Sequence, residues 1–155
     1  NRKRDIMKTT KSLTTKQLAQ QIIKIAKTDS ATISVFTGEP AKPNYWAIGG
    51  MVRPYGEENA LYYSPSGTPD LERLQAKIDA NWEMIQLVGY IGIWRTEDAE
   101  TFIDSTYLIP CCCDTEVGFS EVSFQVAFDL GVSNNQDAIC HVCDSLAEPK
   151  IFELR

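Results

Sequence analysis

The sequence lacks most of the signatures from which a function can be read directly. No stretch approaches the roughly 18 consecutive apolar residues of a membrane-spanning helix, so we expect a soluble protein. Gly49-Gly50 does not have the spacing of a glycine-rich phosphate loop, and the D-x-D-x-D-G spacing of an EF-hand is absent. His141 is the only histidine, so any Cys-His pair or Ser-His-Asp triad would have to use it. The sequence therefore predicts no catalytic residue.

Positive charge is scarce outside the first residues. Five basic residues against one acid give residues 1–11 a charge of +4, which leaves −10 on the other 144 residues. An acidic body repels phosphate backbones and anionic lipid surfaces, so we expect neither a nucleic acid nor a membrane as a partner. Met7 looks like a natural start, and on that interpretation residues 1–6 are upstream sequence.

The composition is that of an ordinary globular protein in a reducing compartment. Hydrophobic residues make up 43% of the chain and charged residues 23%, which argues against disorder. Five cysteines without an apolar secretory signal favour a cytoplasmic location. With no repeat or linker in view, we expect a basic, flexible tip over 1–11 and a single domain over 12–155.

Local signals divide this domain into helices and strands. Thr14 and Gln17 have the spacing of a capping box. Thr68 and Pro69 suit the cap and the first position of a second helix, and the acidic stretch 97–100 suits the tip of a hairpin. The predicted elements are a helix over 15–27, strands over 31–37, 45–53 and 60–64, a helix over 69–86, and strands over 88–96 and 101–110.

The stretch after these elements fits two periodicities. Val122, Phe124 and Val126 alternate as in a strand, whereas Phe119, Val122 and Val126 also fit one face of a helix. Residues 119–130 are therefore left open between the two. The fold class predicted is α+β: an antiparallel sheet of about five or more strands with helices packed on one face, in the order α-β-β-β-α-β-β, followed by this ambiguous tail.

Residues 60–110 carry a family resemblance. The run ALYYSPSGTPDLERLQAKIDANWEMIQLVGYIGIWRTEDAETFIDSTYLIP has a strand, a helix with Ala80-Asn81 near its end, a glycine-containing strand, an acidic turn and a strand closing in Ile109-Pro110. It resembles the fold shared by type III secretion chaperones of the Tir-chaperone kind and the YbjN-like proteins. The resemblance implies a non-enzymatic homodimer that binds a partner polypeptide. The 45-residue tail departs from the single C-terminal helix expected of that fold.

Cysteine clusters at two points, Cys111-Cys112-Cys113 and Cys140-His141-Val142-Cys143. Four thiolates suit a tetrahedral zinc ion, but this spacing matches no familiar ribbon or finger. Cysteine is also among the most buried residue types, so burial as small hydrophobes, with no cofactor, is the alternative to zinc, and redox pairing is a third. The candidate zinc ligands are Cys111, Cys113, Cys140 and Cys143.

Aromatic residues gather on the predicted strands. With helices covering one face of the sheet, strand alternation places about half of these rings on the open face, where large rigid rings serve as interface anchors. The alternative is that they form cross-strand pairs in the core. The candidate partner-binding residues are Tyr45, Trp46, Tyr62, Tyr90 and Trp94.

The function favoured by these observations is a small, acidic, intracellular protein-binding module, chaperone-like or regulatory, non-enzymatic and homodimeric. The first alternative is a zinc-stabilised regulatory domain that uses the cysteine cluster. The second is an enzyme using Cys-His or carboxylate chemistry, for which no substrate class is indicated.

Overall fold

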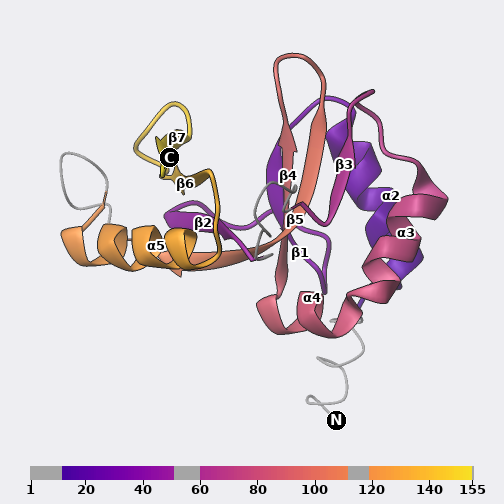
Figure 1. Ribbon diagram of the computed structural model, residues 1–155, viewed down its shortest axis with the longest axis horizontal. Coiled ribbons are helices and arrows are strands. Elements are labelled where there is room, and N and C mark those ends of the chain that lie inside the picture. Colours follow the sequence, from indigo (N-terminus) through magenta and orange to yellow (C-terminus); the bar gives the residue numbers. More distant parts are fainter. Residues whose placement is uncertain (1–11, 51–59, 112–118, 155) are drawn as a thin grey trace, which may run out of the picture.

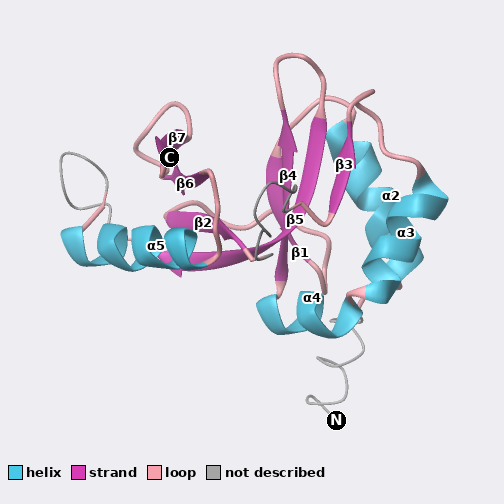
Figure 2. Cartoon of the chain, in the orientation of Figure 1, coloured by secondary structure: helices cyan, strands magenta, loops and turns pink. Residues whose placement is uncertain are grey.

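The computed structural model describes residues 12–50, 60–111 and 119–154, and the fold is α+β (Figures 1 and 2). The tip predicted over 1–11 lies outside these ranges. None of the described helices has the length and hydropathy of a membrane span. The elements are α2 (Thr15–Ala26), β1 (Ala31–Ser34), β2 (Tyr45–Gly49), β3 (Tyr62–Ser64), α3 (Leu71–Ala80), α4 (Trp82–Val88), β4 (Tyr90–Arg95), β5 (Thr101–Pro110), α5 (Glu121–Ser133), β6 (Ala138–Val142) and β7 (Lys150–Glu153).

Strand β5 joins two halves of one antiparallel sheet. The seven strands of the described residues run in the order β1-β4-β5-β2-β6-β7, with β3 also paired to β5. In the first half of β5, Ile103 lies opposite Ile93 of β4 and Tyr62 of β3. In the second half, Ile109 lies opposite Trp46 of β2. The α+β class and the element order predicted up to β5 are confirmed.

Helix α2 starts and ends as its sequence predicts. The Thr14 hydroxyl accepts a hydrogen bond from the Gln17 N–H at 3.1 Å, and the Gln17 side chain accepts one from the Thr14 N–H at 2.9 Å. At the other end, the Arg95 guanidinium donates to the carbonyls of Ala26 and Lys27 at 3.2 and 2.9 Å. This cation satisfies carbonyls that the last turn leaves unpaired and complements the helix dipole.

The helix predicted over 69–86 is divided into α3 and α4. Asp70, and not Thr68, is the N-cap, because its carboxylate accepts a backbone N–H of the first turn at 2.8 Å. At Asn81 the backbone leaves helical geometry, with φ −118° and ψ 17°. The Asn81 side chain donates to the Lys77 carbonyl at 2.9 Å, which offers the backbone an alternative to continuing the helix.

The ambiguous stretch 119–130 is helical from Glu121 onward, where α5 begins. The Ser120 hydroxyl caps the helix by accepting the Ser123 N–H at 3.1 Å. The buried positions of α5 are the small residues Ser123, Ala127 and Gly131, spaced four apart. Neither the strand pattern nor the helix pattern of large apolar residues predicts these three positions, because the helix approaches the sheet through its smallest side chains.

Residues 134–154, for which no element is predicted, form a turn and the hairpin of β6 and β7. Cys140 of β6 lies opposite Ala47 of β2, and His141 lies opposite Trp46. The tail therefore extends the sheet beyond β2, instead of ending the chain with a single helix (Figure 1).

The helices at both ends of β5 pack against the same face of this strand. Ile103 belongs to the core beneath α2, α3 and α4, whereas Ile109 packs in the core beneath α5. The two residues are six positions apart, and an even separation on a strand keeps side chains on one face. The predicted packing of helices on one face is thus confirmed, with separate cores at the two ends of β5. Figure 2 shows α2, α3 and α4 near one end of β5 and α5 near the other.

Trp46 is the centre of the second core. Its side chain is fully buried, and its indole N–H donates to the Ser123 hydroxyl at 3.1 Å, which ties β2 to α5. Four rings surround the indole at centroid distances of 4.7 to 5.6 Å. They belong to Phe119, Phe124, His141 and Phe152.

We expect Trp46→Ala to lower the free energy of unfolding by about 3 to 5 kcal/mol, because it opens a cavity at the junction of α5 and the sheet. Trp94→Ala, which removes the same indole from an exposed site, should cost much less and serves as the control. Urea unfolding followed by far-UV circular dichroism measures both variants. Equal losses would show that Trp46 does not hold the second core together.

Candidate partner-binding face

Three aromatic side chains form a row across the face of the sheet on which none of the described helices packs, called the helix-free face below. Trp94 of β4 lies opposite Phe102 of β5, and Phe102 lies opposite Tyr63 of β3. Each is one position from a residue of the first core, such as Ile93 or Ile103. Because successive strand residues point to opposite faces, the row faces away from the helices. We call Tyr63, Phe102 and Trp94 the aromatic row.

Two members of the aromatic row are fixed against each other, and the third is exposed. The Tyr63 and Phe102 rings stack with centroids 4.6 Å apart and planes 24° apart, and Trp94 is 43% exposed. The Tyr63 hydroxyl donates to the Glu100 carboxylate. Such stacking holds the rings in place before any partner arrives, and this lowers the entropy that binding would cost.

Carboxylates border one end of the aromatic row. The hairpin between β4 and β5 carries Glu97, Asp98 and Glu100, and the first two are exposed. The Thr96 N–H donates to the Glu100 carbonyl at 2.9 Å, so the turn is closed by its own backbone. The result is a negative rim beside an apolar surface. A positively charged group docking on the rings would meet attraction from this rim.

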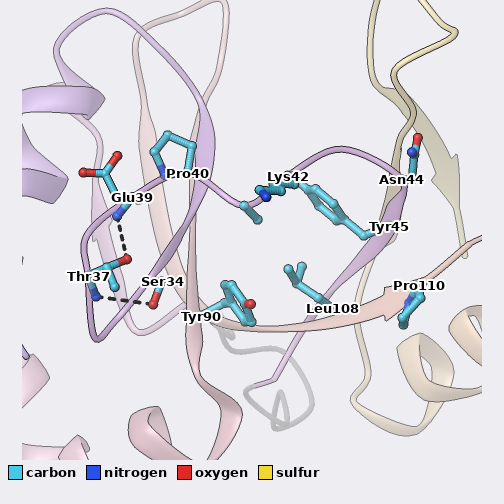
Figure 3. Close-up of a pocket in the computed structure, with 11 residues that line it drawn as sticks. Ser34, Thr37, Glu39, Pro40, Lys42, Asn44, Tyr45, Tyr90, Leu108 and Pro110 are labelled. Carbon is cyan, nitrogen blue, oxygen red and sulfur yellow. Dashed lines mark hydrogen bonds between the residues drawn. The ribbon is translucent and has the colours of Figure 1, made fainter. Parts of the chain in front are cut away.

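A groove of about 510 Å³ lies farther along the same face (Figure 3). Its floor includes Tyr90 and Leu108, whose side chains rise toward the segment that carries Pro40 and Lys42. That segment follows β1 in the chain and folds back alongside it. The Ala41 N–H donates a hydrogen bond to the Thr32 carbonyl of β1 at 2.8 Å. The groove offers space for one or two side chains next to the strands.

The structure divides the five aromatic residues predicted to bind a partner. Trp94 is exposed on the helix-free face, and Tyr45 and Tyr90 line the groove. Trp46 and Tyr62 point into the cores and are 0% and 4% exposed, so their placement on the open face is corrected. Successive residues of a strand point to opposite faces of the sheet, and Trp46 and Tyr62 occupy the positions that point toward the helices.

Tyr45 serves more as a structural residue than as a free anchor. Its side chain is only 8% exposed, and its hydroxyl forms a hydrogen bond with the side chain of Thr32. Burial raises the pKa of Tyr45, with the hydrogen bond to Thr32 acting in the opposite direction. The phenol therefore remains neutral and links β2 to β1.

Phe102 and Tyr63 are the members of the aromatic row that are not among the five candidate partner-binding residues. A signal for Phe102 was available, since a hairpin with its tip at 97–100 places Phe102 opposite Trp94. Tyr63 could not be placed in this way, because β3 reaches β5 through a long connection whose register depends on tertiary packing.

The four candidate zinc ligands are only partly placed by the structure. Cys113 lies outside the described residues. Cys140 alternates with His141 along β6, so its thiol faces away from the second core, against which Cys111 packs. Cys143 is buried, with its sulfur 2.9 Å from the Ser145 hydroxyl oxygen. Among residues 12–50, 60–111 and 119–154, no three His, Cys, Asp or Glu side chains converge as a metal site would require.

One thiol contact was not predicted as a pair. The Cys111 sulfur lies 3.3 Å from Nε2 of His141. His141 is fully buried, and Cys111 is partly buried at the end of β5.

Comparison of the chain with known proteins gave no matching family model, no matching curated protein and no matching solved structure.

The raised pKa of the buried Cys140 thiol predicts that the folded protein loses stability at alkaline pH. Burial raises the pKa of its thiol from 9.0 to about 11, so the folded chain keeps this proton to a higher pH than the unfolded chain does. Retention of this proton stabilises the folded chain fully below pH 9, and the stabilisation is lost as the pH rises toward 11. At pH 11 the free energy of unfolding should be lower by about 2 kcal/mol. Urea unfolding of the wild type and Cys140→Ala from pH 8 to 11 measures the free energy of unfolding at each pH. This free energy should fall less steeply with pH in the variant than in the wild type. Parallel curves would contradict the assignment.

Proposed function

We propose that this protein is a non-enzymatic binding module that holds a partner polypeptide on the helix-free face of its sheet. The observation that carries the proposal is the aromatic row, with Trp94 43% exposed at its end. Large rigid rings in a supported patch are typical of the few residues that supply most of an interface's binding energy.

The chemistry of this face supports a polypeptide with apolar and basic side chains as its partner. Phe102 and Tyr63 are already stacked, so the partner's apolar groups would meet a preformed surface. Glu97 and Asp98 at the rim favour a neighbouring lysine or arginine, and the groove beside Leu108 can take a further side chain. The acidity of the chain, −6 overall, acts in the same direction.

We further propose a cytoplasmic homodimer, in line with the resemblance of residues 60–110 to type III secretion chaperones and YbjN-like proteins. Apolar side chains on the outer side of α5 are a feature that a dimer would explain. Val122 is 75% exposed, and Val126 and Val132 are exposed as well. A helix that presents apolar residues to solvent as well as to the core is unusual in a monomer.

The binding proposal predicts the effect of one substitution. Peptides selected from a random display library against the wild type should bind Trp94→Ala about 30-fold more weakly, because the variant loses an anchor worth about 2 kcal/mol. Leu87→Ala is the matched control, since Leu87 is 88% exposed on α4 and lies outside the face. Isothermal titration calorimetry measures all three proteins.

Selected peptides should contain lysine or arginine near an apolar residue, and their affinity should fall with added salt. Equal binding by the wild type and Trp94→Ala, or loss of binding in Leu87→Ala instead, would contradict the use of the aromatic row.

The homodimer is tested by mass. Size-exclusion chromatography with light scattering at high micromolar concentration should give about twice the 17.4 kDa of one chain. Val126→Glu should shift the mass toward one chain, because it places a charge on the outer side of α5. A strict monomer in the wild type would overturn this part of the proposal, while leaving the peptide measurements to decide the binding function.

A further inference from the structure

The backbone brings a cysteine and the single histidine together on the side of the sheet opposite the aromatic row. Cys111 directly follows β5, and its N–H donates to the Asn44 carbonyl at 3.2 Å. The Asn44 N–H in turn donates to the Val142 carbonyl at 2.8 Å. Cys111 is thus connected through Asn44 to the end of β6, beside His141.

The imidazole of His141 is held in one position. Its ring centroid lies 4.7 Å from that of Trp46 and 5.1 Å from that of Phe119. With the side chain fully buried between these rings, its Nε2 remains directed at the Cys111 sulfur, 3.3 Å away. Cys111 is itself partly exposed, and a small reagent would reach its sulfur from this exposed side.

We propose that Cys111 and His141 form a nucleophilic thiol site that reacts with small peroxides, independently of partner binding. His141 Nε2 removes the thiol proton, and a thiolate beside an imidazolium is the reactive form of cysteine. The thiolate attacks one oxygen of hydrogen peroxide, forming an S–O bond as the O–O bond breaks. The departing hydroxide takes the proton from His141 and becomes water. Sulfur is oxidised to a sulfenic acid, and the peroxide is reduced to water.

Two other cysteines of the chain provide internal controls. Cys140 points away from the second core, and burial raises its pKa to about 11, so its thiol stays protonated at neutral pH. Cys143 is 5% exposed, and its sulfur contacts the Ser145 hydroxyl. Both lie within three residues of His141 in sequence, yet neither combines accessibility with a contact to its imidazole nitrogen as Cys111 does.

The test measures alkylation of the folded chain by iodoacetamide as a function of pH. Cys112→Ser and Cys113→Ser are introduced together so that Cys111 is the only thiol of its run, and peptide mass spectrometry reports each site. At pH 7 we expect Cys111 to react at least about 100-fold faster than Cys140, with a half-maximal rate well below pH 8.5, where a free cysteine titrates.

His141→Gln should move the half-maximal rate of Cys111 toward pH 8.5, provided that circular dichroism shows a folded protein. If that variant does not fold, the test rests on the pH at which the Cys111 alkylation rate is half-maximal in the protein that retains His141. After equimolar hydrogen peroxide at pH 7, dimedone should label Cys111, and Cys111→Ser should abolish the label.

Three results would overturn the proposal. A midpoint at or above pH 8.5 would mean that His141 does not activate the thiol. Dimedone on Cys140 or Cys143 and not on Cys111 would assign the reactivity elsewhere. Alkylation of Cys111 that begins only after addition of EDTA would mean that a metal ion holds the sulfur. None of these results affects peptide binding to the aromatic row, which lies on the other face.

Discussion

The pairing of β5 along ten residues is the constraint on which the other features depend. Its first half binds β4 and β3, and its second half binds β2, so a single strand fixes the register of both halves of the sheet. A shift of one residue would exchange the two faces, which would expose Ile103 and Ile109 and bury Phe102. The two cores, the aromatic row and the groove all follow from this register.

The two faces of the sheet carry different chemistry. The helix-free face presents the aromatic row beside an acidic turn, and the rings of Tyr63 and Phe102 stack on each other there. The covered face holds the second core, where the indole of Trp46 positions His141 against Cys111. A partner on one face and a small oxidant on the other would not compete, because the sheet separates them.

The second core shows how a stretch with two competing periodicities acquires one structure. Helix α5 uses Ser123, Ala127 and Gly131 to approach the sheet, while Phe124 and Phe119 close around the indole. A β-carbon at position 131 would lie 2.8 Å from a methyl of Ile139, so the helix could not sit as close with a larger residue there. Helical structure is thus selected by the fit of small residues against β6 and by the Ser120 cap, not by an apolar stripe.

The sequence by itself determined the α+β class, the element order up to β5, the capping box of α2 and the hairpin of β4 and β5, because each rests on contacts among residues close in the chain. It also contained Trp94, the exposed ring of the candidate face. Only the tertiary structure decided which aromatic residues face outward, since Trp46 and Tyr62 differ from their neighbours by strand phase alone. The meeting of Cys111 with His141 was likewise undetermined, because it depends on β6 pairing with β2 across almost one hundred residues of chain.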